Sequence, residues 1–343
     1  MENIRVGVIG VGSMGERHCR VYSGFRNTEL VGVADLNAVR GQIVAANYGV
    51  HYFEDFERLL AEVDAVSIVT TTPSHFKLAL AALERGVHVL VEKPITETLD
   101  QAKQLVAIAE QAREVLQVGH IERFNPVFTE LKNVVSGMRL IAINVRRLSP
   151  FDISNTDVDV IRDLMIHDLD LMSNLVGQDF DNLNAWGRSI STNAIDHAVT
   201  SFSFRGGPIV TLTASRVTEQ KVRLIEVIAE GAYIEADLLS KSLMIHRRTF
   251  PQYVGRNAGK YRQESVIERI HVPMVEPLML ELSHFLECVR EKKQSSVPGQ
   301  DGLYALQLAQ TISELIKSSN NLNPSLTLLN SATSEMGATL VEI

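Results

Sequence analysis

The most constraining feature of this sequence is a glycine pattern directly behind a short apolar run. Residues 4–9 form the run, and Gly10, Gly12 and Gly15 follow in the spacing G-x-G-x-x-G. Between a strand and a helix, the first glycine permits a tight turn and the second lets backbone amides approach a pyrophosphate. The third allows the helix to pack closely on the strand. The pattern alone is weak evidence, so its surroundings decide what it means.

Short β-rich runs alternate with helical patterns over the first 120 residues. We expect strands at 4–9, 30–34, 65–70, 87–91 and 115–118, and helices at about 13–25, 36–48, 75–85 and 98–113. Because the strands are apolar almost throughout, they predict a parallel sheet that is buried on both faces. The fold class is therefore expected to be α/β, with an N-terminal Rossmann domain built on a doubly wound parallel sheet.

The rhythm changes after about residue 121, where longer strands follow one another. We expect strands at 139–148, 198–204, 209–217, 223–229, 242–247 and 266–272, and helices at 160–175, 277–292 and 300–318. The pair 198–204 and 209–217 reads as a β-hairpin. This order predicts a C-terminal α+β domain with an open, mostly antiparallel sheet.

The length of 343 residues favours two domains. We place an NAD-binding Rossmann domain at residues 1–121 and a substrate-binding and oligomerisation domain at residues 122–343. From about Pro324 onward the sequence is polar and shows no clear pattern.

Charge and composition exclude several classes of protein. A formal net charge of −8 argues against nucleic acid as a partner, because phosphate backbones require a basic surface. No apolar stretch approaches the ~18 residues of a membrane span, and the N-terminal residues do not read as a signal peptide. The two cysteines, Cys19 and Cys288, fit no metal-ligand spacing. We expect a cytoplasmic protein with no metal site and no membrane partner.

An acidic residue supports the dinucleotide interpretation of the glycine pattern. Asp35 ends the second expected strand, some twenty residues after Gly15, where a carboxylate binds the adenosine ribose hydroxyls. It would repel a 2′-phosphate, and no arginine follows immediately at Leu36 or Asn37, so NAD is favoured over NADP. The alternative is that Asp35 merely caps the helix that starts near Asn37.

The loop Thr70-Thr-Thr-Pro-Ser-His75 follows another expected strand. Ligands of open α/β sheets bind at the carboxyl ends of the strands, so this loop should line the cofactor cleft. Alternatively, Ser74 serves only as a helix cap.

Two further motifs carry a family resemblance. His88-Val-Leu-Val-Glu92-Lys93-Pro94 ends a strand at the same sheet edge, and Asp163-Leu-Met-Ile-His167 lies in the expected helix at 160–175. With the glycine pattern and the Thr-Pro-Ser-His loop, they resemble the Gfo/Idh/MocA family of oxidoreductases, and the later antiparallel sheet fits the second domain of that family.

The resemblance implies an activity, an assembly and a set of site residues. It implies an NAD-dependent oxidoreductase acting on CH–OH groups, which assembles as a homodimer or homotetramer through the outer face of its second sheet. The implied catalytic residues are Lys93, Asp163 and His167. The expected cofactor-binding residues are Gly10, Gly12, Ser13, Met14, Gly15, Asp35, Thr71, Pro73, His75, Glu92 and Lys93.

The spacing of polar residues supports the second motif independently. Asp163, His167, Asp170 and Asn174 fall within roughly 60° of one another on a helix of ~3.6 residues per turn. Most residues between them are apolar, which favours a polar stripe that faces a cleft. The alternative is a stripe that faces solvent on an ordinary amphipathic helix.

The chemistry of alcohol oxidation suggests a role for each side chain. A base takes the hydroxyl proton while hydride leaves for the nicotinamide. Neutral His167 suits the role of base, and the ammonium of Lys93 suits the stabilisation of negative charge on oxygen. The two roles could also be exchanged.

The segment Gly119–Pro126 bears on the substrate. It resembles the branch of the family that oxidises the 3-hydroxyl of UDP-N-acetylglucosamine and related UDP-sugars, which implies that Arg123 and Asn125 face the substrate with Asp163 and His167. Alternatively, it is a hinge whose Asn-Pro pair starts a helix.

A second segment, residues 247–263, also bears on the substrate, because it is rich in basic and aromatic residues. It could bind a diphosphate and a uracil ring, or it could be solvated surface.

We therefore expect an NAD-dependent dehydrogenase that oxidises a secondary alcohol of a sugar or nucleotide sugar, with the 3-hydroxyl of a UDP-N-acetylhexosamine as the favoured target. One alternative is a free-sugar or inositol dehydrogenase. The other is a non-catalytic NAD-binding regulator, against which the joint presence of Lys93, Asp163 and His167 argues.

Overall fold

Six strands form the first sheet of the computed structural model, which describes residues 3–152, 158–248, 252–253, 261–262 and 265–321. They are β1 (Ile4–Ile9), β2 (Thr28–Ala34), β3 (His51–Phe53), β4 (Ala65–Ile68), β5 (His88–Glu92) and β6 (Leu116–Gly119). All are parallel, in the order β3-β2-β1-β4-β5-β6. This is the doubly wound order of dinucleotide-binding sheets, and it confirms the expected Rossmann domain.

Helices connect successive strands of this sheet. They are α1 (Ser13–Ser23), α2 (Ala38–Tyr48), α3 (Phe56–Leu60), α4 (Thr72–Leu83) and α5 (Leu99–Ala112). Local chemistry sets several of their ends. The Asn37 side chain accepts a hydrogen bond from the backbone N–H of Arg40 and begins α2, while Thr98 and Gln101 form a capping box that begins α5.

Eight strands form the second sheet. They are β7 (Leu140–Leu148), β8 (Asn182–Arg188), β9 (His197–Ser203), β10 (Ile209–Ser215), β11 (Val222–Ala229), β12 (Ala232–Asp237), β13 (Ser242–Arg248) and β16 (Ser265–Ile270). The order is β16-β13-β12-β11-β7-β10-β9-β8, with every neighbouring pair antiparallel except β7 and β10. The expected hairpin of β9 and β10 and the mostly antiparallel sheet are confirmed.

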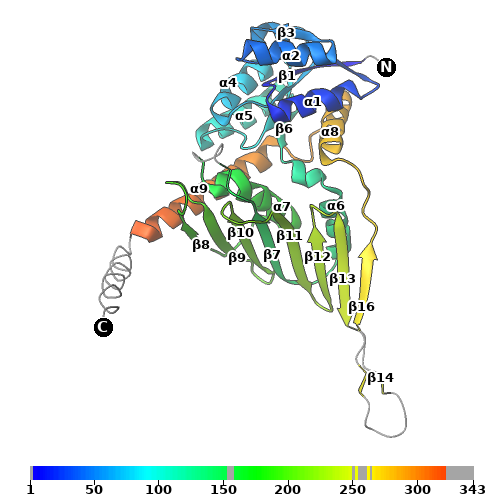
Figure 1. Cartoon of the computed structure of the whole chain (residues 1–343), viewed down its shortest axis with the longest axis vertical. Coiled ribbons are helices and arrows are strands. Elements are labelled where there is room, and N and C mark those ends of the chain that lie inside the picture. The colour runs from blue at the N-terminus through cyan, green and yellow to red at the C-terminus, as the bar shows by residue number, and fades with distance from the viewer. Residues whose placement is uncertain (1–2, 153–157, 249–251, 254–260, 263–264, 322–343) are drawn as a thin grey trace, which may run out of the picture.

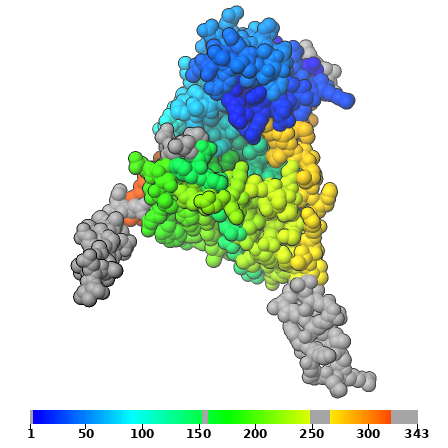
Figure 2. All heavy atoms as spheres, in the orientation of Figure 1, coloured from blue at the N-terminus to red at the C-terminus, as the bar shows by residue number. Residues whose placement is uncertain are grey.

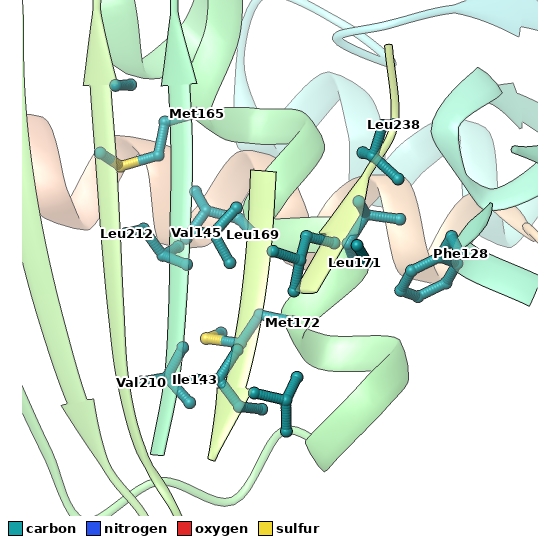
Figure 3. Packing of buried hydrophobic residues seen from close by; sticks show 14 of the residues in the cluster. Phe128, Ile143, Val145, Met165, Leu169, Leu171, Met172, Val210, Leu212 and Leu238 are labelled. Atoms are coloured by element: carbon teal, nitrogen blue, oxygen red, sulfur yellow. The ribbon is translucent and has the colours of Figure 1, made fainter. Parts of the chain in front are cut away.

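Helices cover one face of the second sheet. The short 3₁₀ helix η1 (Ile121–Phe124) leads into α6 (Pro126–Val135), and α7 (Ile166–Val176) and α9 (Gly299–Asn321) complete the layer. Figure 3 shows Leu169 and Met172 of α7 packed toward Val145 and Ile143 of β7. Burial alternates along β9, β11 and β12, so one face of the sheet forms the core and the other faces outward.

The last two helices join the two sheets. Helix α8 (Pro277–Glu291) buries Leu282 and Phe285 in the same hydrophobic cluster as β1 and β2 of the first sheet. Helix α9 contacts both α5 and α7, and the N-terminal domain lies against the helical layer (Figures 1 and 2). The C-terminal part of the chain therefore contributes to both cores. The division at residues 121 and 122 stays a prediction.

Several elements differ from the sequence-based expectation. Strands β3, β8 and β12 and helix α3 were not expected, because β3 and α3 are very short and β8 carries polar residues and a glycine. The expected helix 160–175 begins as a π-helical turn, η3 (Ile161–Met165). The tail beyond Pro324 lies outside the described residues. In the part that the structure describes, no helix is both long and apolar enough to cross a membrane.

Candidate active site

The glycine loop lies between β1 and α1, at the carboxyl edge of the first sheet. Gly10 has a φ of +87°, and a Cβ there would come within 2.6 Å of the Val69 carbonyl oxygen. A Cβ on Gly15 would overlap the Gly10 carbonyl oxygen. Gly12, by contrast, has open space around its Cα, and a Cβ added there would meet only the Arg40 Nη1 atom, at 3.6 Å. The loop therefore leaves room for a phosphate at the N-terminus of α1.

A pocket of about 530 Å³ opens beside this loop. Six of the expected cofactor residues line it, namely Gly10, Gly12, Ser13, Met14, Asp35 and Thr71. The Asp35 carboxylate accepts hydrogen bonds from the backbone N–H groups of Val11, at 2.8 Å, and Asn37, at 2.7 Å. The α2 cap is Asn37, so Asp35 instead ties the end of β2 to the glycine loop. The residues present fit a dinucleotide.

The chain after β4 contributes to the same pocket through Thr70 and Thr71 of the loop and Ser74 of α4. Ser74 lies inside α4, whose cap is Thr71, so the alternative that Ser74 is a cap is wrong. Pro73 lines a different hollow, together with Asp159 and Arg162.

His75, which was expected among the cofactor-binding residues, is buried beside the loop that precedes α4. Only 1% of its surface is exposed, and its ring nitrogens lie 2.8 Å from the Pro94 carbonyl oxygen and 3.1 Å from that of Thr70. It links the loop before α4 to the chain after Lys93, and it does not line the pocket.

Glu92 ends β5 and Lys93 follows it, and the two side chains point to different partners. The Glu92 carboxylate accepts the backbone N–H of Lys93, packs over Gly119 and lies 3.7 Å from Nε2 of buried His18. Burial acts to raise the pKa of Glu92, but His18 and Lys93 outweigh it and hold this pKa below its usual value. Lys93 Nζ donates to the carbonyl oxygen of Asp163 at 2.8 Å and lies 3.5 Å from its carboxylate.

His167 lies in the first turn of α7, two residues beyond the end of η3. Burial holds its pKa well below the usual value, and the nearby cations Lys93, Arg147 and Arg223 lower it further. The imidazole is therefore neutral near pH 7 and able to accept a proton. Lys93 from the first sheet, Asp163 from η3 and His167 from α7 thus meet at one place.

The rest of the polar stripe faces protein, so the solvent-facing alternative is wrong. The Asp170 carboxylate is 2% exposed and receives two hydrogen bonds from the Arg123 guanidinium, at 2.7 and 2.8 Å. Lys132 Nζ donates to Asn174 at 2.6 Å. The half of the stripe beyond His167 therefore attaches α7 to η1 and α6.

Arg123 and Asn125 do not have the free side chains expected of substrate ligands. Arg123 also binds Asp301 at 2.8 Å, and its side chain is 7% exposed. The Asn125 side chain caps α6 by accepting the N–H of Val127, and Pro126 takes the first helical position. The alternative reading of this segment, an Asn-Pro helix start, describes the structure.

Four residues near His167 were missed by the sequence analysis. Arg147 binds Asp168 at 2.8 Å and Glu122 at 2.9 Å, and so fastens α7 to β7 and η1. His120, at the end of β6, lies edge-on to His167. The motif Gly119–Pro126 contains both Glu122 and His120, but nothing in the sequence shows that they face α7. Among the described residues, no group of three or more acidic, histidine or cysteine side chains could hold a metal.

Comparison with known proteins agrees with this geometry. Residues 4–120 match the model of the oxidoreductase family with an NAD-binding Rossmann fold, and residues 150–235 match the GFO/IDH/MocA C-terminal domain. The chain is 39% identical to the UDP-N-acetylglucosamine 3-dehydrogenase of Acidithiobacillus ferrooxidans, over 72% of this chain and 78% of that protein. It is 26% identical to the NAD-dependent scyllo-inositol 2-dehydrogenase of Bacillus subtilis, over 89% of this chain and 92% of that protein.

Solved structures give the same result. That of the A. ferrooxidans UDP-N-acetylglucosamine 3-dehydrogenase superposes with a TM-score of 0.84 at 33% identity, covering 93% of this chain and 99% of the other. A levoglucosan dehydrogenase in complex with NADH and levoglucosan, at 18% identity and a TM-score of 0.78, shares the fold over 92% of this chain and 98% of its own. The N-terminal domain is thus an NAD-binding Rossmann domain, and the chain belongs to the Gfo/Idh/MocA family of oxidoreductases.

Proposed function

We propose that this protein is an NAD-dependent dehydrogenase that oxidises the 3-hydroxyl of a UDP-N-acetylhexosamine. The observation that carries the proposal is the meeting of Lys93, Asp163 and His167 beside the carboxyl edge of the Rossmann sheet. The 39% identity to a UDP-N-acetylglucosamine 3-dehydrogenase supports the choice of substrate.

In the proposed reaction, neutral His167 accepts the proton of the sugar hydroxyl. The Lys93 ammonium, held by the carbonyl and carboxylate of Asp163, donates to the same oxygen and stabilises its developing negative charge. NAD supplies a hydride acceptor when bound. The lowered pKa of His167 supports this division of roles, because the imidazole is uncharged when the substrate arrives.

The pocket residues that we propose as cofactor ligands are Gly10, Gly12, Ser13, Met14, Asp35 and Thr71. Glu92 and Lys93 would extend the site toward the nicotinamide ribose. Arg123, Asn125, Pro73 and His75 are left out, because the first two are bound to protein groups and the last two do not line the pocket. Of the basic stretch 247–263, Arg247 pairs with Glu268, and most of the remainder lies outside the described residues.

We also propose a homodimer or homotetramer in the cytoplasm. Large apolar side chains lie exposed on the outward face of the second sheet, at Trp186, Ile209, Ile228 and Ile267. A patch of this kind is typical of a surface that another subunit covers. Both cysteines are buried free thiols, which suits a reducing compartment.

The proposal is tested by following reduced nicotinamide absorbance after the protein is mixed with NAD and one candidate alcohol. UDP-N-acetylglucosamine, UDP-N-acetylgalactosamine, free N-acetylglucosamine and myo-inositol form the panel. We expect turnover with a UDP-N-acetylhexosamine and none with the free compounds. Turnover with myo-inositol alone would instead favour the alternative that this protein is an inositol dehydrogenase, like the relative that is 26% identical to it. Binding of NAD without any turnover would select a regulator.

A further inference from the structure

A second imidazole lies beside His167. His120 follows β6 directly, and its backbone N–H bonds to the Val118 carbonyl oxygen at 2.8 Å. Its ring stands edge-on to that of His167, with ring centroids 6.3 Å apart and ring planes at 87°. One histidine thus follows a strand of the first sheet and the other lies on α7, and they meet where Lys93 reaches Asp163.

Three of the four ring nitrogens of this pair are buried without a hydrogen-bond partner among the described residues. His120 is 1% exposed, yet neither Nδ1 nor Nε2 is bonded, and Nδ1 of His167 is equally buried and unbonded. A buried polar atom without a partner costs free energy, so an ordinary core histidine is normally bonded. His75 in the same domain shows the ordinary arrangement, with both ring nitrogens beside carbonyl oxygens. Both ring nitrogens of buried His18 are unbonded as well, so it is the unbonded state of His120 together with its place beside His167 that points to a role in chemistry.

The charges around the two rings differ in sign. Besides His120 itself, the charged neighbours that most affect His167 are all cations: Lys93 from the segment after β5, Arg147 from β7 and Arg223 from β11. His120 faces Arg123 and Lys93 too, but also the carboxylates of Asp170 on α7 and Glu92 on β5. A proton is thus less stable on His167 than on His120. The remaining charged groups of the cluster pair with Arg147 or Lys93, and they are Asp168, Glu122 and Asp163.

We propose that His120 receives the proton that His167 has taken from the substrate hydroxyl, and so acts as the second member of a histidine relay. The inference rests on the proposed dehydrogenase function. The hydroxyl O–H bond breaks and an Nε2–H bond forms on His167, while the carbinol hydride passes to NAD. The Nδ1–H bond of His167 then breaks and an N–H bond forms on His120.

The relay explains how a base surrounded by cations can work. An imidazolium at His167 would face Lys93, Arg147 and Arg223 without an adjacent anion among its main neighbours. Passing the proton on restores neutral His167 before the product leaves. At 6.3 Å between centroids the rings are not directly bonded, so one bridging water or a small ring rotation must close the gap.

Kinetics with two substitutions test the relay. His120→Gln keeps hydrogen-bonding groups but accepts no proton, and His120→Phe keeps the ring shape. With NAD and UDP-N-acetylglucosamine, we expect both variants to bind NAD as the wild type does and to lose about tenfold or more in kcat near pH 7. Part of the loss should be recovered as pH rises, because hydroxide then removes the proton. His271→Phe, an exposed histidine away from the site, is the matched control.

The outcomes separate the relay from a structural role and from the proposed function. Full kcat and an unchanged pH profile in His120→Gln would overturn the relay. A His120→Gln variant that keeps its activity where His120→Phe loses it would also overturn the relay, because glutamine accepts no proton. A wild type that oxidises no member of the panel would overturn the proposed function instead.

A measurement without substrate tests the direction of transfer. Imidazole titration by NMR in protein labelled at histidine, with His120→Gln and His167→Gln for assignment, should show His120 taking up a proton at higher pH than His167. The reverse order would overturn the proposed direction, whatever the activity.

Discussion

Individual residues of the cofactor loop were predictable, because the chemistry of a dinucleotide site prescribes their type and spacing. Gly10 and Gly15 have the local geometry that the sequence predicted, whereas the contact of Asp35 with the adenosine ribose stays a prediction. The partners of Arg123 and His120 were not predictable, because Asp301 and His167 lie far along the chain and no local pattern links them. Arg123 was expected to face the substrate and instead holds a buried carboxylate.

Substitution of two glycines separates folding from cofactor binding. Gly15→Ala places a Cβ against the Gly10 carbonyl, so we expect a loss of about 1–3 kcal/mol in unfolding free energy and weaker NAD binding. A Cβ in Gly12→Ala would meet only Arg40 Nη1, at an ordinary contact distance of 3.6 Å, so this variant should keep the melting temperature and lose only affinity for NAD. Thermal unfolding measures the stability of each variant, and calorimetric titration measures its affinity for NAD. Equal melting temperatures for the two variants would contradict this account.

The pH dependence of oxidation follows from the lowered pKa of His167. Oxidation needs the neutral imidazole, and the folded protein keeps it neutral below the reference value of about 6.5. We expect kcat/KM to stay constant as pH is lowered from 7 to 6.5 and to fall only at lower pH. The residual activity of His167→Gln should lack this acidic fall. A wild-type fall centred above pH 6.5 would contradict the assignment of His167 as base.

The lowered pKa of His167 also makes the free energy of unfolding depend on pH. Because the unfolded chain binds a proton at His167 near pH 6.5 and the folded protein does not, this group destabilises the fold as pH drops below that value.

At the scale of elements, long apolar strands and helices were predictable, and short or polar ones were not. β1, α5 and α8 follow clear patterns, whereas β8 alternates Asn, Asn and Trp on its outward face and reads as loop. The π-helical turn η3 before α7 also escaped prediction, because its sequence is as apolar and regular as that of an α-helix. Its consequence is functional, since η3 carries Asp163 toward Lys93.

The attachment of η1 to α7 can be tested at Arg123. Arg123→Met removes both hydrogen bonds to Asp170 and leaves that carboxylate buried without its cation. We expect a loss of about 3–5 kcal/mol in unfolding free energy by denaturant titration. Lys103→Met removes an exposed pair with Asp100 and should cost no more than about 0.5 kcal/mol. Similar small losses in both variants would show that Arg123 does not hold the site together.

At the scale of the molecule, the two sheets were predictable and their connection was not. The sequence indicates a Rossmann sheet followed by an antiparallel sheet, but it gives no sign that α8 returns to the first core. Nor does it show which outward strand residues form a common surface, because this depends on the register of the strands. Trp186, Ile209 and Ile228 share the outward face only in the observed pairing.

The outward face of the second sheet predicts the oligomeric state. Ile209→Asp combined with Ile228→Asp places two charges on this face, so light scattering after size exclusion should show a shift from dimer or tetramer to monomer. Met274→Asp changes an exposed methionine elsewhere and should not alter the mass. A wild-type monomer, or a double variant with unchanged mass, would refute the proposed interface.

The convergence of Lys93 and His167 on one substrate oxygen is tested most directly by a double-mutant cycle of single-turnover rates. Lys93→Met, His167→Gln and the double variant are mixed with NAD and UDP-N-acetylglucosamine, and reduced nicotinamide is followed over time. Each single variant should lose roughly 10²-fold or more, and the double variant should be scarcely slower than the slower single one, since the two groups act as a unit. Losses that multiply, or a single variant with the full rate, would contradict the shared site.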